Sequence, residues 1–168
     1  MENDNKVSNT LNCMWTLWAH LPRDTSWKLP SYKKIMSFNS VEEAIVLTET
    51  ISHKMVRNCM LFIMREGITP MWEDHRNKEG GSFSYKVSNK IVPNTWKELS
   101  HKLVGESLIQ AGDKQMHVNG ITISPKKNFC VIKIWMANCD SQDSTIIDGS
   151  IQGIEPQGCL FKKHNPEY

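Results

Sequence analysis

Two tryptophans in polar surroundings are the residues of this chain best suited to hold a flat ligand. Trp27 lies in the polar segment 21–31, and Trp72 lies in the segment 70–81, where most of the following residues are charged. Either side chain alone is equally compatible with packing into a core. Two such loop tryptophans together indicate a stacking platform, because an aromatic face binds a nucleobase with about 1–3 kcal/mol.

A carboxylate directly follows the second of these tryptophans, at Glu73. It can accept two hydrogen bonds from a planar donor edge, and guanine presents such an edge through N1–H and its exocyclic amine. A cationic base would add cation–π attraction to the stack and charge assistance to these hydrogen bonds. The common base with that fixed charge is the 7-methylguanine of the messenger RNA cap. For Glu73 considered alone, a solvated loop carboxylate is the alternative interpretation.

Two lysine pairs offer local positive charge for the triphosphate that such a cap carries. Lys126 and Lys127 lie in the turn 124–128, and Lys162 and Lys163 lie near the end of the chain. Each pair is also compatible with an ordinary solvated surface. The formal net charge is only +2, from 20 basic and 18 acidic residues. This balance excludes a broad electrostatic grip along nucleic acid but leaves room for a short anionic ligand.

The composition indicates a single folded domain. The 168 residues are 39% apolar and 23% charged, so we expect a flexible tail over 1–10 and one domain over 11–168. The sequence contains neither a signal-peptide core nor an apolar run of about 18 residues, which predicts a cytoplasmic protein with no membrane partner. The five cysteines form no C-x-x-C pair. We therefore expect no zinc site, no disulfide framework and no other metal or cofactor.

Strand signals outnumber helix signals along the chain. Two capping boxes predict helices that begin at Ser40, with Glu43, and at Thr95, with Glu98. The segment 141–154 is ambiguous between helix and loop. Alternating or β-branched runs predict strands at 13–20, 33–38, 59–64, 82–87, 118–123, 129–136 and 159–161. The turns between neighbouring strands are often too short for parallel crossovers, so the pattern predicts an α+β domain, a mostly antiparallel sheet with helices on one face.

The remaining tryptophans fall within these predicted elements. Trp15 and Trp18 lie in the first strand, Trp96 in the second helix and Trp135 in the strand 129–136. Packing is the favoured role for each of them, because a tryptophan in a regular element usually buries its large apolar surface. Trp135 also has a position at which it can border a binding site.

Several ordered motifs resemble the cap-binding translation initiation factors of the 4E class. The most specific is the segment 67–81 (GITPMWEDHRNKEGG). Further matches are Trp15-x-Leu-Trp18, Phe38-x-Ser-Val41, Leu103-x-Gly-Glu-Ser107 and Ile132-x-Ile-Trp135. The resemblance runs from about Leu11 to Trp135 and weakens after Cys139. It implies a curved antiparallel sheet of about eight strands backed by three helices on its convex face, the third of them poorly formed in the divergent C-terminal region.

The resemblance also implies roles for individual residues. Trp27 and Trp72 match the pair of tryptophans that sandwiches 7-methylguanine. Glu73 matches the carboxylate that binds N1–H and N2–H, and Trp135 matches the tryptophan near the N7 methyl group. Lys126 aligns with the first phosphate-binding arginine of the family, where a lysine offers a point charge in place of a bidentate fork.

Two other positions depart from the family pattern of phosphate contacts. Asn128 and Val131 stand where the family has lysines. Lys127, Lys162 and Lys163 are the candidates to replace that charge.

A second surface implied by the resemblance is the helical side of the sheet, where the family binds a 4G-type scaffold or a repressor through a tyrosine-and-leucine helical peptide. Val41 and Glu98 match this surface. Ile45 stands where the family has its key tryptophan, and Lys97 and His101 replace two apolar contacts. We therefore expect a monomeric protein that binds such a partner through an altered surface.

The sequence leaves four functions open. The first is binding of the 7-methylguanosine cap for translation initiation, and the second is sequestration of the cap by a translational repressor. The third is an enzyme that acts on capped nucleotides, but the chain has no Nudix-type helix, H-x-H-x-H, G-x-S-x-G or P-loop motif. The fourth is an interaction domain that retains the fold and has lost cap binding.

Overall fold

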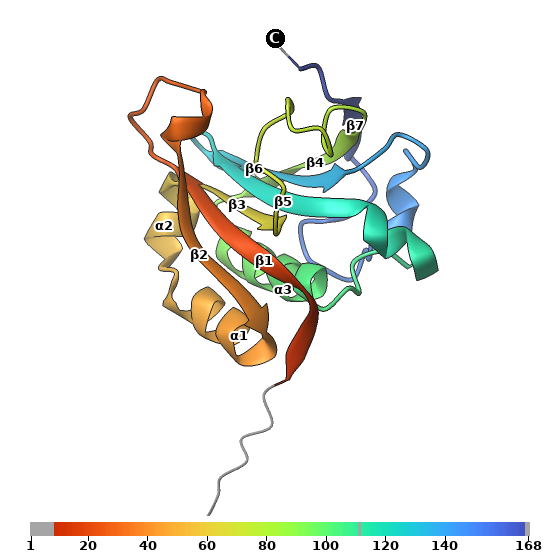
Figure 1. The fold of residues 1–168 in the computed structure, drawn as a ribbon, viewed down its shortest axis with the longest axis horizontal. Helices are drawn as coiled ribbons and strands as arrows, with labels where there is room; N and C mark the ends of the chain where they lie inside the picture. Colours follow the sequence, from red (N-terminus) through yellow and green to blue (C-terminus); the bar gives the residue numbers. More distant parts are fainter. Residues whose placement is uncertain (1–8, 111, 167–168) are drawn as a thin grey trace, which may run out of the picture.

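Seven strands form one sheet in the computed structural model, which describes residues 9–110 and 112–166 (Figure 1). The strand order is β2-β1-β3-β5-β6-β4-β7, and each neighbouring pair of described strands is antiparallel. The strands are β1 (Thr10–His20), β2 (Tyr32–Ser40), β3 (Met60–Arg65), β4 (Gly81–Ser88), β5 (Val118–Pro125), β6 (Phe129–Met136) and β7 (Leu160–Lys163). Every predicted strand is present, and the described sheet has one strand fewer than the eight implied by the resemblance.

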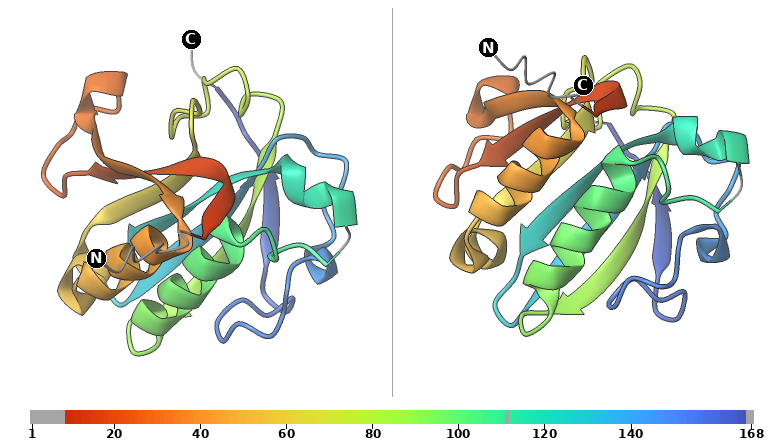
Figure 2. Two further views of the ribbon diagram at one scale, coloured as in Figure 1. Left: turned by 60° about the horizontal axis from the view of Figure 1, so that its bottom comes forward. Right: turned by 90° about the horizontal axis from the view of Figure 1, so that it is seen from below.

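The helices lie on one face of this sheet and leave the other face open (Figure 2). They are α1 (Val41–Thr50), α2 (His53–Asn58) and α3 (Val92–Val104), with short 3-10 turns η1 (Leu29–Ser31), η2 (Gly112–His117) and η3 (Ser144–Ile146). The expected count of three helices is correct, but the expected place of the third is wrong. The segment 141–154 contains only η3, and the third helix is α2.

The starts of α1 and α3 show where local sequence signals succeed and fail. Ser40 caps α1 as predicted, because its Oγ accepts a hydrogen bond from the backbone N–H of Glu43 at 3.2 Å. The second predicted capping box is wrong. Helix α3 begins three residues earlier, at Val92, and the Thr95 hydroxyl donates to the backbone oxygen of Gln152 at 2.7 Å.

Side chains alternate between two apolar clusters, one on each face of the sheet. The large cluster lies between the sheet and the helices and contains Trp15 and Trp96. The smaller cluster, on the open concave face, contains Phe62, Met64, Ile68 and Trp135, with Trp18, Tyr32 and Met60 packed against it. This second cluster forms the floor on which a ligand site is built.

The described part of the chain begins at residue 9. Residues 1–8, most of the expected tail, lie outside the described residues, and Thr10 already belongs to β1. Among the described helices, none combines the length and the apolar composition required to cross a membrane.

Candidate functional site

Trp27 is held in the connection between β1 and β2 by the histidine that ends β1. The rings of Trp27 and His20 stack with centroids 4.0 Å apart and planes inclined by 7°. His20 is buried, and its Nε2–H donates to the carbonyl of Ser26 at 2.7 Å. Tyr32 contacts both rings edge-on. One face of the indole is therefore covered, while 56% of the residue remains exposed.

Trp72 and Glu73 lie in the connection between β3 and β4, which has a fixed shape without regular secondary structure. The Asp74 carboxylate accepts hydrogen bonds from the backbone N–H and the hydroxyl of Thr69, both at 2.8 Å. Burial would raise the pKa of Asp74, but these bonds and one from the Arg76 backbone hold it below its usual value. The ionised carboxylate thus closes the turn that presents Trp72 and Glu73.

Asn77 ties the same connection to the sheet. Its side-chain amide donates to the backbone oxygens of Thr69 and Met71, both at 2.9 Å. Its own side-chain oxygen accepts from Asn119 at 2.9 Å, and both asparagines are buried. These contacts determine the entry and exit of the segment that carries the exposed tryptophan.

His164 supports Trp72 from the interior. Its ring stacks with that of Trp72 at 5.9 Å and 16°, and lies 5.0 Å from the Trp135 ring. Nδ1 is 2.7 Å from the Asn77 carbonyl, so Nδ1 carries the proton, and Nε2 accepts from the Ser82 hydroxyl at 2.7 Å. Burial lowers the pKa of His164 in spite of the bond to Asn77. A neutral imidazole therefore stands behind Trp72.

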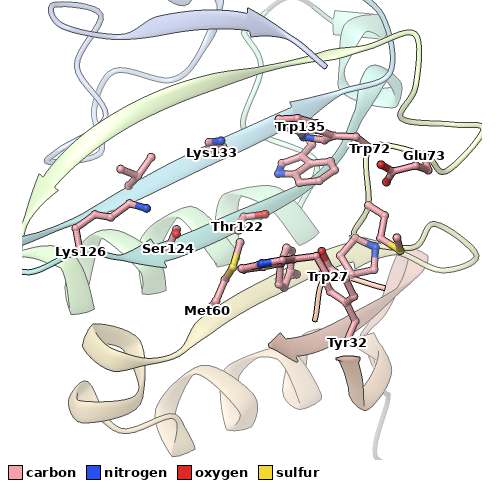
Figure 3. A pocket seen from close by; sticks show the side chains of 14 residues that line it. Trp27, Tyr32, Met60, Trp72, Glu73, Thr122, Ser124, Lys126, Lys133 and Trp135 are labelled. Atoms are coloured by element: carbon pink, nitrogen blue, oxygen red, sulfur yellow. The ribbon is translucent and has the colours of Figure 1, made fainter. Parts of the chain in front are cut away.

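Both loop tryptophans face one cavity of about 470 Å³ on the concave side of the sheet (Figure 3). Trp135, only 4% exposed, and Thr122 belong to its floor. Glu73 lies at the end near Trp72, and burial together with the Glu73 carboxylate raises the pKa of Tyr32 to about 12. The lining residues are Trp27, Tyr32, Met60, Phe62, Pro70, Met71, Trp72, Glu73, Thr122, Ser124, Lys126, Val131, Lys133 and Trp135.

The expected base-binding residues thus all line one cavity, whereas only one of the four expected phosphate-binding lysines does. Lys126 lines the cavity, but Lys127, Lys162 and Lys163 are exposed and do not. Lys163 pairs with Gly81 and shares the face of Phe161, which packs against the helical core, so it points away from the cavity.

The residues of this site that were not predicted from the sequence include the two supporting histidines, His20 and His164, and the lining residues Thr122 and Lys133. Strand periodicity offers a signal for Lys133, because alternate residues of a strand point to the same face of the sheet. Lys133 follows this rule relative to Trp135, and it lines the cavity with its Nζ 5.9 Å from the centre of the Trp72 ring.

The expected partner residues lie together on α1 and α3, which run side by side (Figure 2). Val41 and Ile45 of α1 and Glu98 of α3 are exposed. The fourth, His101, is half-buried, with Nε2 2.8 Å from the Thr48 hydroxyl, and burial and Lys97 lower its pKa. We refer to these four residues, Val41, Ile45, Glu98 and His101, as the helical surface.

Polar contacts between the two helices partly cover this surface. Lys97 of α3 forms an ion pair with Glu49 of α1. The His101–Thr48 contact links the same two helices one turn further along. A partner would therefore meet an apolar patch on α1 beside a charged strip on α3.

The described residues contain no group of three or more histidine, cysteine, aspartate or glutamate side chains placed to hold a metal ion. The cavity instead offers aromatic faces, one carboxylate and two lysines. This set is suited to a flat base with a donor edge and an attached anion.

Comparisons with known proteins find similar sequences over most of this chain. The family model described as Eukaryotic initiation factor 4E matches residues 10–165. Eukaryotic translation initiation factor 4E of Candida glabrata is 27% identical over 146 residues, which cover 83% of this chain and 68% of that protein. The corresponding protein of Saccharomyces cerevisiae is 26% identical over 155 residues, covering 88% and 71%.

Solved structures show the same fold. Ascaris suum eIF4E-3, solved in complex with an m7G cap, superposes with a TM-score of 0.77 at 21% identity, covering 95% of this chain and 93% of that one. Caenorhabditis elegans eIF4E-3, solved with the 4E-binding protein Mextli and a cap analog, gives a TM-score of 0.78 at 23% identity, covering 94% and 93%.

Proposed function

We propose that this chain, which belongs to the eukaryotic initiation factor 4E family, binds the 7-methylguanosine cap of messenger RNA for translation initiation. The observation that carries the proposal is the meeting of Trp27, Trp72 and Glu73 at one cavity from two separate loops. Aromatic faces on two loops and a carboxylate beside them match a cationic base with two N–H donors.

In this proposal the base stacks between Trp27 and Trp72 and donates N1–H and N2–H to Glu73. Trp135 lies on the cavity floor and borders the methylated edge of the base, while Lys126 attracts the phosphates. These roles are binding roles, so the protein acts as a cap-binding factor in the cytoplasm and not as an enzyme. Rigid support from His20 and His164 lowers the ordering cost of the two stacking rings.

This function is tested by titrating the protein with 7-methyl-GTP and with GTP while its tryptophan fluorescence is measured. We expect quenching by the methylated nucleotide and a much weaker response to GTP. Trp27→Ala and Trp72→Ala should each lose about 1–3 kcal/mol of binding free energy, because each removes one stacking face. Trp27→Phe and Trp72→Phe, which keep an aromatic ring, serve as matched controls and should lose less.

Two results would contradict the proposal. Equal affinity for GTP and 7-methyl-GTP would remove the role of the cationic base. Chromatography of the titrated samples shows whether the nucleotide has been hydrolysed, and hydrolysis would favour an enzyme instead.

We also propose that the helical surface binds a helical peptide of the 4E-binding class. The exposed patch of Val41 and Ile45 supports this assignment, since an amphipathic helix can cover it. Ile45→Trp should strengthen binding of a 4G-type peptide measured by calorimetry, because aromatic side chains are strong interface anchors. Val46→Trp, on the same helix but outside this surface, is the control, and equal gains in both variants would argue against the assignment.

A further inference from the structure

The cavity floor continues from the tryptophans along the hairpin of β5 and β6. On β6 the side chains of Trp135, Lys133 and Val131 share the concave face, because alternate residues of a strand point the same way. Lys126 lies beyond them, at the turn of the hairpin. Figure 3 shows Lys133 on β6 between Trp135 and Lys126, and all four residues line the cavity.

Lys133 is a positive charge without an acidic partner in the part of the chain that the structure describes. Its ammonium lies 5.9 Å from the Trp72 ring centre, and none of the ion pairs among described residues includes it. Burial, with the charges of Lys126 and Lys162, lowers the pKa of Lys133. A half-buried ammonium among like charges is stabilised by an anion, which the cavity itself does not supply on this side.

A second polar group beside Lys133 also has no partner. Thr122 of β5 stands directly opposite Lys133 in the strand register and lines the same cavity. Its hydroxyl is buried and makes no hydrogen bond with any described residue. Buried hydroxyls are normally hydrogen-bonded, so an unpaired one in a cavity floor indicates a place for a ligand oxygen.

The two lysines occupy different depths along the path that leads away from the base. Lys133 lies in the register row next to Trp135, opposite Thr122. Lys126 follows Thr122 by four residues, which corresponds to about 13 Å along a strand. With the N1 edge of the base at Glu73, the ribose and its phosphates leave toward the lysine end, and they pass Lys133 before they reach Lys126.

Resting on the proposed function, we propose that Lys133 binds the phosphate attached to the ribose and that Lys126 binds the outer phosphates. The two lysines thereby divide the phosphate chain between them. Lys133 sets the affinity for any 7-methylguanosine nucleotide, and Lys126 distinguishes the triphosphate from the monophosphate.

The test uses 7-methylguanosine, its 5′-monophosphate and its 5′-triphosphate as ligands, in fluorescence titrations of the full chain. Lys133→Met should lose about tenfold in affinity for both nucleotides and leave the nucleoside unchanged. Lys126→Met should lose a similar factor for the triphosphate alone. Lys163→Met is the control. It also removes one lysine charge, but this side chain on β7 points away from the cavity, so none of the three affinities should change.

The outcomes separate this proposal from the proposed function. If the unaltered protein fails to prefer 7-methyl-GTP over GTP, the proposed function falls. If that preference holds but Lys133→Met affects the nucleoside equally, affects only the triphosphate or has no effect, the division between the lysines is wrong. Circular dichroism checks the fold of each variant, and Lys133→Gln replaces Lys133→Met if the latter does not fold.

Discussion

Glu73→Gln is expected to weaken binding of 7-methyl-GTP by about 2–5 kcal/mol, the range for truncating one partner of a buried, hydrogen-bonded charge pair. The substitution keeps the size of the side chain and replaces one carboxylate oxygen with an amide. The amide would then face the donor edge of the base, so one hydrogen bond is lost and two N–H groups oppose each other. The charge that favours a cationic base disappears at the same time.

The same ligands measure this effect, with GTP as the reference. Because GTP lacks the fixed charge, Glu73→Gln should reduce the preference for the methylated base as well as the affinity. Glu79→Gln, in the same β3–β4 connection but outside the cavity lining, is the matched control and should bind as the unaltered protein does. A preference for 7-methyl-GTP that survives in Glu73→Gln would show that Glu73 does not bind the base edge.

The residues of this site that could be predicted are those that stand in a local sequence unusual for their type. Trp27 and Trp72 stand in polar loops, where burial of an indole has no local support, and this conflict indicated a ligand. His20 and His164 were not predictable as supports, because their contacts join residues far apart in the chain. His164, for instance, bonds to Ser82 across 82 positions.

The fold was likewise predictable where a pattern within one segment determines the structure, and not where a segment is very short or a long-range contact decides. Strands with alternating apolar residues were predictable because the period alone identifies the buried face. Helix α2 has only six residues, too few for a helical period to show. The Thr95 capping box failed because its hydroxyl is engaged by the Gln152 backbone, a long-range contact that no local pattern contains.

A mostly buried ion pair outside the cavity lining gives the largest expected effect on stability. Arg65, at the end of β3, forms two hydrogen bonds with the Glu106 carboxylate, at 2.7 and 2.9 Å, and both side chains are mostly buried. It also donates to the backbone oxygens of Val118 and Gln115. Burial alone would lower the pKa of Arg65, but the bonds to Glu106 raise it. This guanidinium thus joins β3 to the segments that lead into β5.

Arg65→Met should lower the free energy of unfolding by about 3–5 kcal/mol in urea titrations, because Glu106 is left as an uncompensated buried charge. The double variant Arg65→Met with Glu106→Gln should recover part of this loss, since the charge is then gone. Lys34→Met breaks the half-exposed pair with Glu66 and should cost at most about 1 kcal/mol. If the double variant is no more stable than Arg65→Met, the lost hydrogen bonds to Val118 and Gln115, and not the stranded carboxylate, account for the destabilisation.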